Sequence, residues 1–195
     1  MTDPTKNTLD IVLQIIAMIG AAIAFWIGLR QWRRGQDWQR AEQMDKFVLQ
    51  FENDELLCLA ATIIDWTRRK VKFREREFVV TNTDALLALR DHTKMGEQPL
   101  FEGEQATLRD AYDALLAFFA RLELALSTRL IDVAPAKQYF RYWLEHFLAF
   151  DRHPDSKNLL QGKSPQEMIK GYIEAYADPD SIRRLCKLLE VEDTL

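Results

Sequence analysis

The chain has 195 residues, of which 48% are hydrophobic and 29% are charged, and its formal net charge at pH 7 is −4. This balance is typical of a globular protein that buries a substantial core, and it excludes an intrinsically disordered chain. The negative net charge argues against nucleic acid as a partner.

The first feature along the chain is an uncharged run over residues 11–29, in which Gln14 is the only strongly polar side chain. A helix of about 19 residues spans roughly 28 Å, close to the hydrocarbon thickness of a bilayer. The run therefore predicts one transmembrane helix, preceded by a short extracytoplasmic N-terminus over 1–10. A cleaved signal peptide is the alternative, because Ala22-Ile23-Ala24 resembles a cleavage site. The acids Asp3 and Asp10 before the run argue against cleavage.

Charged and aromatic residues at the end of this run predict its orientation. Basic residues follow the run, whereas only Lys6 precedes it. Because positive charge is retained on the cytoplasmic side, we expect the N-terminus outside and the C-terminal domain in the cytoplasm, at the cell (inner) membrane. The expected anchors at the membrane interface are Trp26, Arg30, Trp32, Arg33 and Arg34.

Small residues recur within the run at a spacing of four, at Gly20, Ala24 and Gly28. Such a stripe lets a second helix approach closely, so it predicts a helix-helix contact in the membrane. The contact would be made with a second copy of the chain or with the span of a protein partner. The alternative is that Gly and Ala are simply common in membrane helices.

Helical periodicity continues after the run, which predicts a juxtamembrane helix over 30–53 and a cytoplasmic helical domain over 54–195. Asn53 is the expected N-cap of the domain's first helix, which ends near Trp66. Alternating apolar and charged residues over 71–80 then indicate a short β-hairpin that turns near Glu75.

Basic residues concentrate at the start of this hairpin. They form a candidate contact patch for anionic lipid headgroups or an acidic partner. A solvated helix end or edge strand is the alternative interpretation, and it is the favoured one because runs of charge usually face water. The residues are Arg68, Arg69, Lys70, Lys72 and Arg74.

The rest of the chain predicts further helices over about 83–92, 104–130 and 135–150, with two more starting at Pro165 and Pro179. Leu108, Leu115 and Leu122 are seven apart on the longest of these. This heptad spacing indicates the central helix of a bundle, with a dimer seam as the alternative. Ser164 and Glu167 form a capping box. The predicted fold class is all-α, with one transmembrane helix followed by an antiparallel helical bundle.

No established catalytic or phosphate-binding motif is present, and we expect no catalytic residue, cofactor or metal site. The three histidines, of which His146 lies beside Glu145, are expected to have surface or structural roles. Glu123 is expected to be buried and paired with an arginine, with Arg121, Arg129 and Arg141 as candidates. Both cysteines, Cys58 and Cys186, are expected to be core thiols.

Four short segments resemble bacterial proteins that have one N-terminal span and a small cytoplasmic helical domain. They are Asp65-Trp66, Arg121-Leu122-Glu123, Ile131-Asp132 and the aromatic segment Tyr139-Phe140-x-x-Trp143-Leu144. The resemblance covers residues 10–150 and implies an architecture, but no activity.

These features favour a membrane-anchored protein-interaction module, an accessory or scaffolding subunit of a membrane complex. One alternative is a membrane-tethered sensor or effector, in which the cytoplasmic domain controls oligomerisation. Such a sensor would need a pocket between the helices over 104–130 and 135–150. A lipid-directed enzyme is the least favoured interpretation, because it would need carboxylates or His146 to converge in a cleft.

Overall fold

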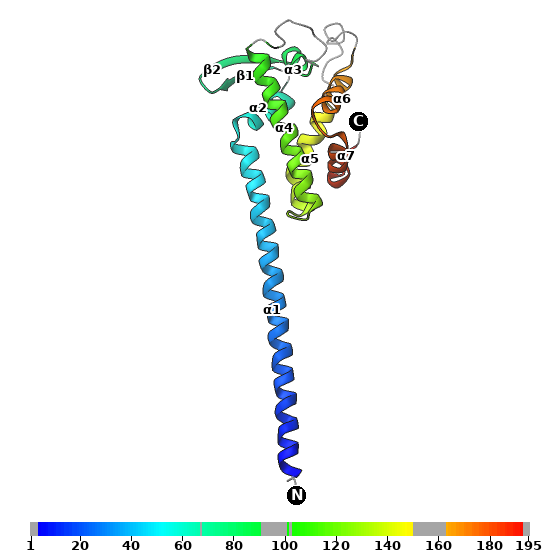
Figure 1. The fold of residues 1–195 in the computed structure, drawn as a ribbon. Helices are drawn as coiled ribbons and strands as arrows, with labels where there is room; N and C mark the ends of the chain where they lie inside the picture. Colours follow the sequence, from blue (N-terminus) through cyan, green and yellow to red (C-terminus); the bar gives the residue numbers. More distant parts are fainter. Residues whose placement is uncertain (1–3, 67, 91–100, 102, 150–162, 193–195) are drawn as a thin grey trace. The chain divides into compact units, whose positions relative to one another are not determined.

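The computed structural model describes residues 4–66, 68–90, 101, 103–149 and 163–192, without the side chains of 4–12 and 15. This part of the chain is mostly helical, with seven helices and one two-stranded antiparallel sheet (Figure 1). The chain divides into two units, an N-terminal unit over 1–42 and a C-terminal unit over 43–195. The helical prediction and the predicted hairpin are confirmed.

Helix α1 covers Pro4–Asn53 and accounts for the N-terminal unit (Figure 1). Over the residues that the structure describes, no helix is both long and apolar enough to cross a membrane. The described residues therefore do not support the transmembrane helix predicted over 11–29. Large apolar side chains on this stretch of α1 are nevertheless exposed, among them Ile16, Ile23 and Phe25.

The C-terminal unit begins with the last turns of α1, where Met44 and Phe51 are buried. Helix α2 (Glu55–Asp65) follows, and its N-cap is Asp54, whose carboxylate accepts the N–H groups of Leu56 and Leu57 at 2.9 and 3.1 Å. The prediction of Asn53 as N-cap is wrong by one residue. Asn53 is the last residue of α1, and its side-chain amide donates to the Leu49 carbonyl.

Strands β1 (Arg68–Phe73) and β2 (Arg76–Thr81) form the hairpin, with Arg74 and Glu75 as its two-residue turn. Helix α3 (Asn82–Ala88) starts directly after it, at a capping box made by Thr81 and Asp84. The part of the helix predicted after residue 90 lies outside the described residues. The hairpin and α3 thus connect α2 to the segment that precedes α4.

Helix α4 (Glu104–Ser127) packs against α2, α3 and α7, and it is the central helix of the C-terminal unit. It ends three residues before the predicted Leu130, because Arg129 adopts a left-handed φ of 59° and the Leu130 N–H turns back to the Ala125 carbonyl. The residues at heptad spacing, Leu108, Leu115 and Leu122, are all fully buried. The heptad pattern is therefore satisfied inside one chain, as the bundle interpretation predicted.

Three helices complete the unit. Helix α5 (Val133–Leu148) begins two residues before the predicted Pro135, which proline permits because the first turn of a helix needs no donor there. Helix α6 (Pro165–Tyr176) has the predicted capping box of Ser164 and Glu167. Helix α7 (Pro179–Leu189) starts after the N-cap Asp178 and packs on α4 and α5.

Glu123 of α4 is buried, as predicted, but its partners lie on α7 and at the end of its own helix. Its carboxylate accepts hydrogen bonds from Arg184 Nε at 2.9 Å, from Ser181 at 3.2 Å and from Ser127 at 2.6 Å. The predicted partners Arg121, Arg129 and Arg141 were wrong, because the helix that supplies Arg184 is about 60 residues away in sequence. This contact joins α7 to α4.

The Glu123 network makes stability depend on pH. The hydrogen bond from Arg184 lowers the pKa of Glu123; burial opposes this shift and the two serine hydroxyls add to it. A carboxyl whose pKa is lower in the folded state stabilises the fold above its unfolded pKa of about 4.3, and loses that contribution as pH falls through the folded pKa. We expect Glu123→Gln to unfold at lower denaturant concentration than wild type at pH 7, with the gap closing in acid.

Urea titrations of the full chain between pH 7 and pH 3 would measure this gap. The exposed Glu174 on α6 offers a matched control, and Glu174→Gln should follow the wild-type pH dependence throughout. A gap of constant size down to pH 3 would contradict the assigned role of Glu123.

Candidate functional site

The predicted basic patch lies on β1 and its turn, and the strand divides it between two faces. Successive side chains of a strand point to opposite faces of a sheet. Arg68, Lys70 and Lys72 therefore share one face, and all three are exposed. Arg69 lies on the other face, with its guanidinium 4.8 Å from the ring centroid of Trp66. The patch is thus a row of three cations, not a cluster of five.

Few anions neutralise this row. Glu77 of β2 pairs with Lys70 at 2.7 Å, although Glu77 stands directly opposite Lys72 in the register. Within the described part of the chain, Lys72 has no ion pair. The face therefore retains net positive charge beside the exposed apolar side chain of Val79.

Arg74, the fifth residue of the predicted patch, occupies the turn. Its φ is 53°, in the left-handed region where a residue with a side chain is disfavoured. Arg74 is the first of the two turn residues. When the first turn residue has a positive φ, it is usually Gly. The Arg74 guanidinium lies 5.2 Å from the ring centroid of Phe73. The hairpin thus ends in an exposed cation held over an aromatic ring.

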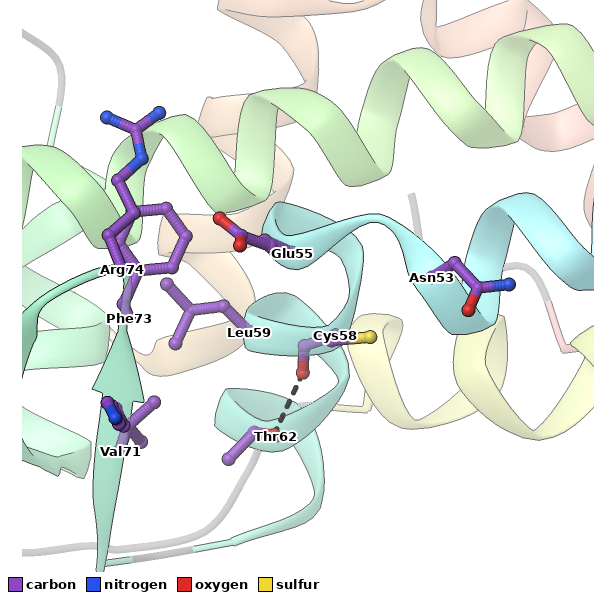
Figure 2. A pocket seen from close by; sticks show the side chains of 9 residues that line it. Asn53, Glu55, Cys58, Leu59, Thr62, Val71, Phe73 and Arg74 are labelled. Atoms are coloured by element: carbon purple, nitrogen blue, oxygen red, sulfur yellow. Dashed lines mark hydrogen bonds between the residues drawn. The ribbon is translucent and has the colours of Figure 1, made fainter.

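A groove of about 330 Å³ lies between α2 and β1 (Figure 2). Its apolar lining comes from Leu59 of α2 and from Val71 and Phe73 of β1. Figure 2 shows the side chains of Leu59 and Glu55 directed from α2 toward Phe73. The groove has no local signal in the sequence, because its walls come from α2 and β1 and meet only in the folded chain. It gives the basic strand an apolar neighbour.

Cys58 lies on the rim of the groove and is exposed, so its prediction as a core thiol is wrong, whereas Cys186 is buried as predicted. Figure 2 shows the Cys58 thiol directed away from the hairpin and toward Asn53. Partial burial raises the pKa of this thiol, and the neighbouring carboxylates of Asp54 and Glu52 raise it further. The thiol is therefore a weak nucleophile at neutral pH.

The predicted stripe on α1 is exposed throughout, at Gly20, Ala24 and Gly28. A Cβ atom added at Gly20 or Gly28 would meet no atom within 4 Å. The fold of the described residues therefore places no requirement for glycine at either position. The expected interface anchors are exposed as well: Trp26, Arg30, Trp32, Arg33 and Arg34. Of these, Arg30 lies 5.8 Å from the ring centroid of Trp26.

His146 is the histidine in the described part of the chain, and it packs against Tyr142 of its own helix. The imidazole of His146 stacks on Tyr142 at 3.8 Å, and Nδ1 lies 2.9 Å from the carbonyl of the same residue. His92 and His153 lie outside the described residues. Among those described, no group of three or more His, Cys, Asp or Glu side chains is placed to hold a metal ion.

Aromatic rings fill the region between α4 and α5 where a sensor pocket would be needed. Phe118 of α4 and Phe140 of α5 pack edge to face with centroids 5.2 Å apart, and Phe119 and Phe147 pack at 6.2 Å. All four rings are buried. The basic hairpin, together with the groove between α2 and β1, combines charge, exposure and a recess.

Comparison with known proteins finds no matching family, no matching curated protein and no matching solved structure. The resemblance to single-span bacterial proteins therefore remains a prediction.

Proposed function

We propose that this chain is a membrane-anchored protein-interaction module, an accessory or scaffolding subunit of a membrane complex. Residues 11–29 of α1 form its anchor, the N-terminus lies outside, and the C-terminal unit lies in the cytoplasm. The anchor binds lipid and contacts a partner span or a second copy of the chain through Gly20, Ala24 and Gly28. The C-terminal unit supplies the binding surface for protein.

The observation that carries the proposal is the exposed apolar surface of α1. Eight large apolar side chains between Leu13 and Ile27 are 47–73% exposed, and no charged residue lies among them. A contiguous apolar surface of this kind marks a site of contact with lipid or protein. The anchor includes all of residues 11–29, of which the side chains of Ile11, Val12 and Ile15 lie outside the described residues.

Charge supports the proposed orientation, and lack of chemistry supports the proposed class. Arg30, Arg33 and Arg34 follow the run, as expected on the cytoplasmic side of a span. Among the described residues, no group of three or more His, Cys, Asp or Glu side chains is placed to hold a metal ion, and the aromatic core between α4 and α5 is packed. Binding is the activity that these features favour.

The first test is to extract the full-length protein in mild detergent and to determine the subunit composition of the particle. We expect sedimentation with membranes that resists an alkaline wash, and a particle in which other proteins appear in fixed ratio. Replacing Gly20, Ala24 and Gly28 by Leu should break the particle, because bulky side chains prevent close approach of helices. Recovery of the chain in the soluble fraction would refute the anchor.

A matched control uses the opposite side of the same helix. Ala22→Leu adds apolar bulk at one position away from the stripe and should leave the particle intact, whereas Ala24→Leu adds the same bulk within the stripe and should break it. If both variants behave alike, the stripe is not the contact.

Orientation can be measured with a membrane-impermeant thiol reagent on intact cells. A cysteine introduced as Thr5→Cys should react from outside, whereas the native exposed Cys58 should react only after the membrane is opened. Labelling at alkaline pH increases the thiolate fraction of Cys58, whose pKa is raised by partial burial. Protection of residue 5 in intact cells would reverse the proposed orientation.

A further inference from the structure

The free edge of β1 has unused backbone groups. In an antiparallel pair, residues alternate between those that exchange hydrogen bonds with the partner strand and those whose N–H and C=O groups point away from it. The two-residue turn makes Phe73 and Arg76 the closing hydrogen-bonded pair. The backbone groups of Arg68, Lys70 and Lys72 therefore point to the free edge, where no other part of the described chain bonds to them.

The same three residues carry the cationic side chains of the exposed face. A strand added along this edge would continue the pleat, so its alternate side chains would lie beside these cations. Carboxylates at every second position would match them. Lys72, which lacks an ion pair in the described chain, would gain the most from such a neighbour.

The remaining side chains of an added strand would lie on the opposite face. On that face β1 presents Val71 and Phe73, and beside them runs the groove to Leu59 of α2 (Figure 2). The rest of the groove is lined by polar or charged residues and by Cys58, so apolar side chains fit at its apolar part. The other lining residues are Asn53, Glu55, Cys58, Thr62, Lys72 and Arg74. The free edge of β1, its cationic face and the groove together favour an added strand in which acidic and apolar residues alternate.

We infer that β1 binds an extended acidic segment of a partner protein by strand addition, with acidic side chains beside Arg68, Lys70 and Lys72 and apolar ones toward the groove. The inference rests on the proposed function and names the class of partner. Strand addition supplies affinity through main-chain hydrogen bonds and specificity through alternate side chains. A lipid surface would use the cations alone, without the strand edge or the groove.

The probe is a labelled, end-capped peptide of about ten residues in which Glu alternates with Val, measured by fluorescence anisotropy on the full-length protein in mild detergent. A peptide of the same composition with its glutamates in one block should bind about 10-fold more weakly, because it cannot match both faces. Equal binding of the two peptides would show that charge alone acts, and would overturn strand addition.

Backbone methylation tests the main-chain contact. Methylating alternate amides of the Glu-Val peptide gives two versions, of which only one blocks the hydrogen bonds to β1. We expect one version to lose binding and the other to keep it. Two versions with the same affinity would contradict the proposed geometry.

Two substitutions of equal charge change test the strand. Lys72→Glu should weaken binding about 10-fold, because an exposed charge that becomes repulsive slows association with an acidic segment. Arg76→Glu, on the exposed surface of β2, should change affinity by less than about 2-fold. Unaltered circular dichroism would show that both variants fold. If Arg76→Glu weakens binding as much as Lys72→Glu, the net charge of the hairpin, and not the β1 edge, is the determinant.

Vesicles containing phosphatidylserine are the competing probe. Vesicles that bind the cationic face and displace both peptides equally would assign the surface to lipid and overturn the inference. If the detergent-extracted particle has other proteins in fixed ratio but neither peptide binds, the β1 inference is wrong and the proposed function still holds. If the chain is recovered alone in the soluble fraction and still binds the alternating peptide, the proposed function is wrong and the β1 inference still holds.

Discussion

Phe118→Ala is expected to lower the free energy of unfolding by about 3–5 kcal/mol, the usual cost of removing a buried aromatic ring and leaving a cavity. Phe118 is fully buried on α4, and four other rings pack on it with centroids 5.2–6.2 Å away. These rings belong to the end of α1, to α4 and to α5, so the substitution loosens three helices at once. They are Phe47, Phe51, Phe119 and Phe140.

Chemical denaturation of the full chain in mild detergent, followed by circular dichroism, would measure this loss. Leu124→Ala is the matched control, because Leu124 lies on the same helix and is 61% exposed. We expect the control to change stability by less than about 0.5 kcal/mol. A loss below about 1 kcal/mol for Phe118→Ala would mean that the three helices do not share one core.

Arg109→Ala is expected to cost about 2–4 kcal/mol, because it leaves buried acceptors without a donor. The side chain is almost fully buried, and its Nη1 donates to the carbonyls of Ala88 and Arg90 at 3.2 and 3.1 Å. Its guanidinium carbon also lies 4.2 and 4.0 Å from the ring centroids of Tyr172 and Tyr176. One side chain therefore joins α3, α4 and α6.

Arg109→Lys separates the contributions. Lysine keeps the charge but lacks the planar fork, so we expect it to recover part of the loss and not all of it. Arg141→Ala is the control, since Arg141 is exposed and pairs only loosely with Glu145, at 3.6 Å. Its effect should stay near the 0.5 kcal/mol or less of a surface helix pair. Full recovery by lysine would show that charge matters and the fork does not.

Most local elements of the C-terminal unit could be predicted from the sequence. Alternation over 71–80 predicted the hairpin, because a strand repeats every two residues. The capping box at Ser164 and the proline at 179 marked the starts of α6 and α7. The heptad spacing of Leu108, Leu115 and Leu122 predicted a buried helix. Each of these signals lies within a single element, so it can be recognised without knowledge of the tertiary structure.

Contacts between residues that are far apart in the chain could be found only from the folded structure. Glu123 pairs with Arg184, and Arg109 enters a site between Tyr172 and Tyr176, although these partners are more than 60 residues away from them. The basic patch was visible in the sequence, but its division by the pleat and the groove beside it were not. Such contacts depend on how helices pack, and packing is set by the shapes of all side chains at once rather than by any local pattern.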